Sequence, residues 1–377
     1  MHIRPFEALY PDQALVTAEP DFFDTAKESY QQFLQAGFFN KMDMPALFLY
    51  QIQAPERRYT GVLACTDLRD YLEGDIKKHE NTIRAEEEKQ MRLTLEREAA
   101  VKPVLLTYPE NEEIDQFLDT YAAQHPVFLE LYFPADRQIH RLWAIREPES
   151  ISRIQQLFMT NVPHAYIADG HHRMCAMALI VENTKSDRLR RIYSDVFCAF
   201  FPSRQLDILE FNRVVEIQDG TEIQDFFKNL EQLFDIQPLD GAEKPAQLHE
   251  MTFCTILGWY RLRWKPEVLQ EFAGERVILD TMLLNELVLN RLLGIREVRD
   301  DRRVSYINAP KGLEAIQTEV ANQLNRVGFC LYPVQFEDLK NLVEAGKTLP
   351  PKSTWFEPRM KNGVIVKPYD GMGFDRD

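Results

Sequence analysis

The sequence lacks any apolar run close to the length of a membrane span. A helix that crosses a bilayer needs about 18 or more consecutive apolar residues, and no stretch of the 377 residues comes near this. The first residues, MHIRPFEALYPD, also lack the apolar segment and small-residue cleavage site of a secretory signal. We therefore expect no membrane partner and a cytoplasmic location.

Positive charge and cysteine are both in short supply. Lys and Arg number 44 against 59 Asp and Glu, which gives a net charge of −15. A duplex-binding protein needs a broad basic surface, so nucleic acid is an improbable partner, although a local basic patch remains compatible with this balance. The five cysteines are scattered without a Cys-x-x-Cys pair. We expect them to be reduced structural thiols.

Several familiar catalytic motifs are incomplete. The AGKT stretch at 345–348 lacks the glycine that a P-loop places five residues before its Gly-Lys, because that position is Asn341. The HENTI stretch has Ile83 where a zinc-protease motif needs its second histidine. Gly-x-Ser-x-Gly is absent as well. P-loop, zinc-protease and serine-hydrolase chemistry are thereby excluded.

The length and the mixture of patterns predict two α/β regions. Strands are expected at 46–53 and 59–66, and helices at 21–36 and 84–99. The pattern restarts after a soft boundary near 205–220. We expect a mixed α/β (α+β) fold, with a first region at 1–210 that carries the site and a second at 211–377 that closes over it.

The stretch YIADGHHRMCA at 166–176 is the strongest candidate for a binding site. A strand that turns at Gly170 into a helix would point free N–H groups and the positive end of the helix dipole outward, and phosphate binds at such ends. His171, His172 and Arg173 would add donors. Asp169 would be a helix cap, a magnesium ligand or an acceptor for a substrate hydroxyl. A solvated polar turn is the open alternative.

The stretch IKKHENT at 76–82 is the second candidate. Glu80 could act as a general base, with Lys77, Lys78 and His79 setting its electrostatic field. The alternative is a basic patch at the start of a solvated helix, with Thr82 as its cap.

Five motifs in this order resemble the bacterial and archaeal family called domain of unknown function 1015. They are KKHENT, YIADGHHR, LDILEFNRVV, LHEMTF and PPKSTWFEPRMKNGVIV, and the resemblance runs from about residue 45 to 370. The family name carries no activity. The last motif brings Lys352, Ser353 and Thr354 as candidates for the rim of the same cleft, with a rigid structural loop as the alternative.

The Asp-Gly-His-His-Arg box also resembles the phosphate-binding box of the ParB/sulfiredoxin fold, which includes free serine kinases. The resemblance implies a ParB/sulfiredoxin-like first region. It assigns His79 and Glu80 to the upstream pair whose glutamate is the base for the serine hydroxyl, and Asp169 to the substrate or metal. Sulfiredoxin-like repair needs a cysteine in the box. Because position 171 is His, we do not expect this activity.

The sequence departs from both patterns. The gap between Glu80 and Asp169 is longer than in the small serine kinases, and TAEPDFFDTAKESY replaces the family's PPYD-like box. TIRAEEEKQ stands where the family continues Thr-Arg-Pro-Asp-Lys. These departures predict an altered substrate or a loss of activity.

Two functions follow as hypotheses. The first is a phosphotransferase that uses ATP or ADP with Mg²⁺ on a small hydroxyl metabolite, possibly free L-serine, because phosphoryl transfer requires mainly positioned charge and a base. The second is a nucleotide-binding switch or interaction protein of the ParB type. Turnover that depends on an added hydroxyl substrate would distinguish them.

Overall fold

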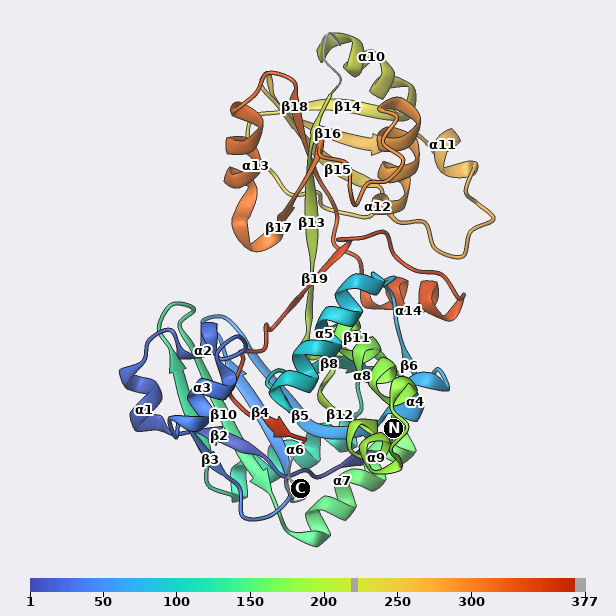
Figure 1. The fold of residues 1–377 in the computed structure, drawn as a ribbon. Helices are drawn as coiled ribbons and strands as arrows, with labels where there is room; N and C mark the ends of the chain where they lie inside the picture. Colours follow the sequence, from blue (N-terminus) through green and yellow to red (C-terminus); the bar gives the residue numbers. More distant parts are fainter. Residues whose placement is uncertain (218–222, 370–377) are drawn as a thin grey trace. The chain divides into compact units, whose positions relative to one another are not determined.

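The computed structural model describes residues 1–217 and 223–369. The chain divides into two compact units. Unit 1 comprises Met1–Lys78, Thr82–Asp207 and Pro358–Asp377, and unit 2 comprises His79–Asn81 and Ile208–Glu357. Both units combine helices with a sheet (Figure 1), which confirms the expected mixed α/β fold class. In the ranges that the structure describes, no helix combines the length and the apolar character that crossing a bilayer requires.

The division into units differs from the expected regions 1–210 and 211–377 at two places. The tail from Pro358 belongs to unit 1, because its strand β20 (Lys367–Pro368) pairs with β7 (Ala99–Ala100) and Tyr369 joins the unit 1 core. His79–Asn81 belongs to unit 2, although the residues on both sides of it belong to unit 1. In both places, segments that are distant in sequence belong to the same unit. Local sequence patterns cannot predict such long-range contacts.

Unit 1 is built on a mixed sheet with the strand order β6-β11-β8-β12-β5-β4-β10-β9, and β1 pairs with β5. The pairs β6–β11 and β8–β12 are parallel and the others are antiparallel. The central strands read as apolar runs because both of their faces are covered. The strands are β1 (Ile3–Arg4), β4 (Leu47–Gln53), β5 (Arg58–Asp67), β6 (Ile76–Lys77), β8 (Val104–Tyr108), β9 (Leu129–Phe133), β10 (Gln138–Ile145), β11 (Ala165–Asp169) and β12 (Asp195–Pro202).

Helices pack against this sheet. Met174, Met177 and Ile180 of α8 and Ile154 and Phe158 of α7 enter the main core cluster with the sheet residues. The helical elements of unit 1 are α1 (Gln13–Ala18), α2 (Phe22–Thr25), α3 (Tyr30–Gln35), α4 (Leu68–Leu72), α5 (Arg84–Arg97), α6 (Glu112–Gln124), α7 (Pro148–Asn161), α8 (His171–Asn183), α9 (Asp187–Ser194) and η1 (Ser203–Gln205). A small sheet of β2 (Leu9–Pro11) and β3 (Phe39–Lys41) adds to the unit.

Unit 2 is built on a second sheet with the order β14-β16-β15-β18-β13-β17, and β19 pairs with β13. Its core contains Phe226, Phe253, Leu287 and Phe329. Its strands are β13 (Asp207–Glu216, which begins at the last residue of unit 1), β14 (Phe234–Leu239), β15 (Glu250–Thr255), β16 (Gly258–Trp264), β17 (Val304–Asn308), β18 (Arg326–Cys330) and β19 (Thr354–Glu357). Its helical elements are α10 (Ile223–Leu233), α11 (Pro266–Gln270), α12 (Asp280–Leu283), the π-helical η2 (Leu284–Leu292), η3 (Ala309–Lys311), α13 (Gly312–Ala321) and α14 (Phe336–Glu344).

Candidate functional site

The turn from β11 into α8 has the strand, turn and helix order that the sequence predicts (Figure 1). The helix starts at His171, with Gly170 as its N-cap at φ 103°. This left-handed conformation favours glycine. A Cβ at this position would also lie 2.6 Å from the Arg173 guanidinium. Gly170 therefore permits both the turn and the close approach of Arg173.

Among the described residues, three cationic side chains converge on the Asp169 carboxylate. The Arg173 Nη2 atom donates to Asp169 Oδ2 at 3.0 Å, and Lys102 Nζ lies 3.7 Å from the same oxygen. Arg359 Nη1 lies 3.5 Å from Oδ1. Arg173 Nη2 also donates to the Pro103 carbonyl at 3.1 Å. The side chains of Asp169 and Lys102 are only 29% and 19% exposed. This partial burial strengthens the interaction of their charges.

The surroundings change the pKa values of this cluster. Burial by itself would raise the pKa of Asp169, but Arg173, Lys102 and Arg359 outweigh it and hold that pKa well below its usual value. Burial lowers the pKa of Lys102 to about 8, against the opposing attraction of Asp169. Asp169 is therefore ionised at neutral pH and acts as the common counter-ion of three cations.

The cluster suits an anion better than a cation. Three positive side chains share one carboxylate, so positive charge is in excess around Asp169. The first turn of α8 adds the unpaired N–H groups and the partial positive charge of a helix N-terminus. Asp169 is not the helix cap that the sequence allowed as one interpretation, because Gly170 is the N-cap and no side chain caps it.

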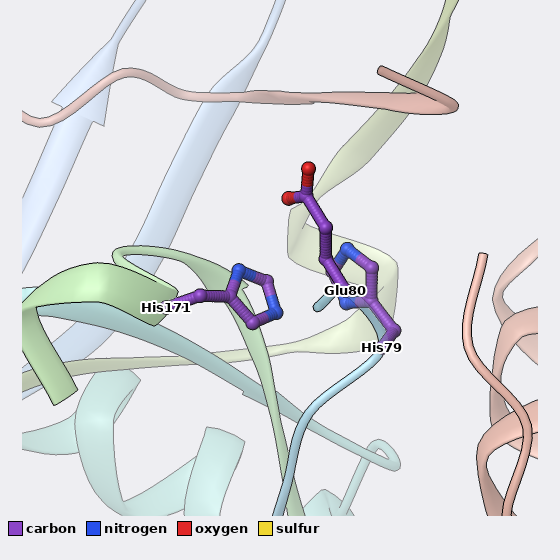
Figure 2. Close-up of side chains that lie close together, drawn as sticks. All are labelled: His79, Glu80 and His171. Atoms are coloured by element: carbon purple, nitrogen blue, oxygen red, sulfur yellow. The ribbon is translucent and has the colours of Figure 1, made fainter. Parts of the chain in front are cut away.

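The two histidines of the box have different surroundings. His171 is buried at the first position of α8, where Figure 2 shows its ring. His172 Nε2 accepts a hydrogen bond from the Ile83 backbone N–H at 3.3 Å. A ring nitrogen that accepts cannot carry a proton, so only Nδ1 of His172 is available as a donor. His172 thus helps to hold the segment that precedes α5.

His79 and Glu80 lie on the segment that follows β6 (Figure 2). Within unit 2, His79 is buried against the Phe356 ring, with Nε2 3.3 Å from Thr354 Oγ1. The His79 carbonyl accepts from Leu349 N–H at 2.8 Å. His79 is thus fixed by backbone, ring and side-chain contacts.

Asn81 is the third residue of this segment. Its side chain donates to Thr348 Oγ1 at 3.2 Å, and its carbonyl accepts from Arg299 at 3.2 Å. Glu80 therefore lies between two residues that unit 2 holds in place, and its own side chain is partly exposed.

The residues that flank this segment are anchored in unit 1. Ile76 and Lys77 form β6, which runs parallel to β11 with Lys77 opposite Tyr166. Lys78 is exposed. Thr82 Oγ1 lies 3.6 Å from Cys175 Sγ of α8 and also bonds to Glu87. Thr82 does not cap α5 as the alternative interpretation had it, because the N-cap residue is Ile83.

The three side chains of the PPKST turn that the sequence offers as candidates have different contacts. Thr354 contacts His79, as described above. Ser353 is buried and donates to the Pro350 carbonyl at 2.7 Å. Lys352 Nζ lies 5.5 Å from the centre of the Phe211 ring. Ser353 and Lys352 thus shape and pack the turn.

Sequence reasoning missed Lys102 and Arg359. Lys102 precedes β8, which is the sheet neighbour of β11, so a correct strand order would have indicated it. Arg359 belongs to the quoted tail motif PPKSTWFEPRMKNGVIV, but only the return of the tail to unit 1 brings it to Asp169. The Asp169–Arg173 pair is local, because only the turn at Gly170 and the first residues of α8 separate the two side chains.

Comparison with known families gives a match over most of the chain. The profile of the family described as "Protein of unknown function (DUF1015)" matches residues 7–286. The chain belongs to this family. This confirms the resemblance drawn from the motifs. No curated protein matches the chain.

Solved structures similar to this DUF1015 member are distant. SbnI with a C-terminal truncation, from Staphylococcus aureus, has 15% identity and a TM-score of 0.43, covering 84% of this chain and 90% of its own. A free serine kinase in complex with AMP has 12% identity and a TM-score of 0.37, covering 83% and 95%. A conserved hypothetical protein from Pyrococcus furiosus has 12% identity and a TM-score of 0.37, covering 82% and 96%. At this degree of likeness, neither ligand nor activity carries over.

Proposed function

We propose that this protein is a nucleotide-dependent phosphotransferase that acts on a small hydroxyl metabolite, with free L-serine as the first candidate acceptor. The observation that carries the proposal is the convergence of Lys102, Arg173 and Arg359 on Asp169 at the start of α8. Arginine and lysine bind phosphate oxygens through charge-assisted hydrogen bonds, and a helix N-terminus adds to this attraction. The phosphates of ATP or ADP fit this chemistry.

The chain path supports Glu80 as the base that accepts the hydroxyl proton. Strands β6 and β11 are parallel, so both chains leave the sheet at the same edge. Three residues of extended chain span at most about 10 Å. Glu80 is three residues beyond Lys77, just as Asp169 is three residues beyond its partner Tyr166. Beyond Glu80 the chain returns at Thr82 and Ile83, which contact α8. The residues before and after segment 79–81 are therefore held by β11 and α8.

The contacts of His79 suggest that it positions its neighbour. Its ring is buried between Thr354 and Phe356, so it has little freedom to act as an acid or base itself. A fixed ring at 79 would restrict the backbone at Glu80 and orient the carboxylate. In this proposal Glu80 is the catalytic residue and His79 a positioning residue.

The surroundings of Asp169 do not fit magnesium. A magnesium ligand needs free carboxylate oxygens and an environment that tolerates more positive charge. Both Asp169 oxygens already face cations. The proposal therefore gives Asp169 the task of holding the three cations in place. Magnesium would accompany the nucleotide as the partner of its own phosphates.

The test is acceptor-dependent turnover. The protein is incubated with ATP or ADP and Mg²⁺, with and without a panel of hydroxyl compounds that starts with L-serine, and phosphorus NMR follows the products. A new phosphomonoester, with nucleotide consumed only when an acceptor is present, would support the proposal. Absence of nucleotide binding, measured by thermal shift in the same samples, would overturn it.

Glu80→Gln is the variant that isolates the base. The substitution keeps the shape of the side chain and removes its ability to take a proton. We expect nucleotide binding to stay within about twofold and turnover to fall by about 10²–10⁴-fold, the usual contribution of a general base. Glu73→Gln, at an exposed position, is the matched control and should leave both unchanged. A Glu80→Gln protein as active as the parent would remove Glu80 from the mechanism.

A second candidate is a nucleotide-binding switch without an acceptor. The same cations support it, because they suit a phosphate group, and because Asp169, which faces three cations, is poorly placed to bind a metal for phosphoryl transfer. Slow nucleotide hydrolysis that no hydroxyl compound accelerates would favour this function over the kinase.

A further inference from the structure

A second group of cations lines a small cavity of unit 1. The cavity has a volume of about 40 Å³, and Lys27, Arg97, Lys102 and Arg173 contribute to its walls. We call these four residues the cation pocket. They come from four places in the chain: the interruption between α2 and α3, the end of α5, the residue pair before β8, and the first turn of α8. The remaining wall is mostly apolar and includes Val101, Val104, Met177, Phe197 and Tyr369.

The positive charge of the cation pocket exceeds its negative charge. Among the residues that the structure describes, neither Lys27 nor Arg97 forms an ion pair with a carboxylate. Glu28 and Glu96 act on Arg97 from a greater distance, and Glu28 also acts on Lys27. Asp169 is the counter-ion of Arg173 and Lys102 and is shared with Arg359. Four cationic side chains therefore line one cavity in a protein that has 59 Asp and Glu residues and is acidic as a whole.

Arg173, one of the residues that line this pocket, has a donor without a partner in the described chain. Within the described chain, Arg173 Nε is buried without a hydrogen-bond acceptor, whereas Nη2 of the same side chain bonds to Asp169 and Pro103. A buried donor left without an acceptor destabilises the folded protein. An anion that accepts from Arg173 would remove this destabilisation.

Burial acts on the other cations in the same direction. It lowers the pKa of Lys27, and the neighbouring Arg97 and Arg173 charges add to the effect. It also lowers the pKa of Arg97. These shifts mean that burial beside other cations disfavours the charged form of both side chains. A bound negative charge would reverse that penalty.

The dimensions of the cavity limit the ligand. One water-sized atom needs about 10–15 Å³, so 40 Å³ accommodates about three. This suits a compact oxyanion whose remaining oxygen faces the opening, and it excludes a nucleoside. An adjoining groove of about 640 Å³ also has Lys27, Gln90 and Arg97 in its wall, and it provides a path from solvent.

We propose that the cation pocket binds a small inorganic oxyanion, of which phosphate is the natural candidate, as a site additional to the nucleotide site of the proposed function. Lys27 and Arg97 belong to this pocket alone, whereas Arg359 belongs to the Asp169 cluster alone. Lys102 and Arg173 are common to both. The two sites are therefore adjacent but can be separated by substitution.

The experiment is a calorimetric titration of the full chain with sodium sulfate and, separately, with sodium phosphate, without nucleotide. Lys27→Gln and Arg97→Gln should each weaken anion binding by about tenfold or more, since each removes a charged hydrogen-bond donor. Arg92→Gln removes an equal charge at an exposed position of α5, outside the walls of the pocket and of the groove, and should change the affinity by less than about twofold. Thermal melting of each variant checks that it is folded.

The outcomes separate this proposal from the proposed function. No saturable binding to the parent protein, or an equal loss in Arg92→Gln, overturns the pocket. Binding that survives Lys27→Gln and Arg97→Gln but is lost in Arg359→Gln also overturns it, and it leaves the nucleotide site standing. If either variant does not fold, a selenate-soaked crystal of the parent decides: anomalous density between Lys27, Arg97 and Lys102 supports the pocket, and its absence refutes it.

Discussion

Asp169 organises charge that comes from three separate segments of unit 1. Arg173 is four residues further along the chain in the first turn of α8, Lys102 precedes the neighbouring strand, and Arg359 comes from the tail. Only the first of these partners could be predicted from the sequence, because its spacing is local. Glu80 and His79 could be proposed from their motif, whereas the contact of His79 with Thr354 links residues 275 positions apart.

Lys102 provides a pH test at the residue scale. Burial is the larger influence on its pKa, which falls from 10.5 to about 8 in the folded protein. Between pH 8 and 10.5 the unfolded chain binds more protons at this residue, so the stability of the folded protein gains with rising pH. Lys102→Met should lack this gain, which is worth up to a few kcal/mol at about 1.4 kcal/mol per pH unit. Denaturant unfolding at several pH values measures it.

The matched control for this prediction is Lys89→Met, at an exposed site on α5. The difference in unfolding free energy between parent and Lys102→Met should grow from pH 8 to 10.5, and the difference for Lys89→Met should stay flat. If the difference in unfolding free energy is independent of pH for both variants, Lys102 titrates with its ordinary pKa and water reaches the cluster around Asp169.

Local patterns predict some elements well and others poorly. The strands expected at 46–53 and 59–66 are β4 at Leu47–Gln53 and β5 at Arg58–Asp67, and the charged helix expected at 84–99 is α5 at Arg84–Arg97. The helix expected at 21–36 is wrong, because α2 ends at Thr25 and α3 begins only at Tyr30. The prediction rested on the helical spacing of Phe23, Ala26, Tyr30 and Phe33, of which Ala26 and Tyr30 are buried and the two phenylalanines are partly buried against the same core cluster. Lys27 lies in the interruption and lines the cation pocket.

The start of α8 provides a test at the scale of the element. Gly170→Ala would place a side chain in the left-handed region, at about 1–2 kcal/mol of stability, and would also push against the Arg173 guanidinium. We therefore expect both a lower unfolding free energy and weaker nucleotide binding. Gly74→Ala is the control, because Gly74 has φ 90° and open space where its Cβ would lie. Gly74→Ala should lower the unfolding free energy and leave the nucleotide affinity unchanged. Nucleotide affinity unchanged in Gly170→Ala would separate Arg173 from the binding site.

At the scale of the whole molecule, the chain assembles its candidate sites from segments far apart in sequence. The tail returns to unit 1 with Arg359, and residues 79–81 leave unit 1 to join unit 2. A net charge of −15 describes the molecule as a whole and conceals the local excess of cations at Asp169 and in the cation pocket. Composition could therefore argue against nucleic acid, but it could not indicate where an anion would bind.

The most direct test of the central claim is a crystal structure of the protein grown with ADP and Mg²⁺ in a medium free of phosphate and sulfate. The account predicts nucleotide phosphate oxygens within hydrogen-bond distance of Arg173, of Arg359 and of the backbone N–H groups at the first turn of α8. Nucleotide bound elsewhere, with only water at the β11–α8 turn, would contradict it.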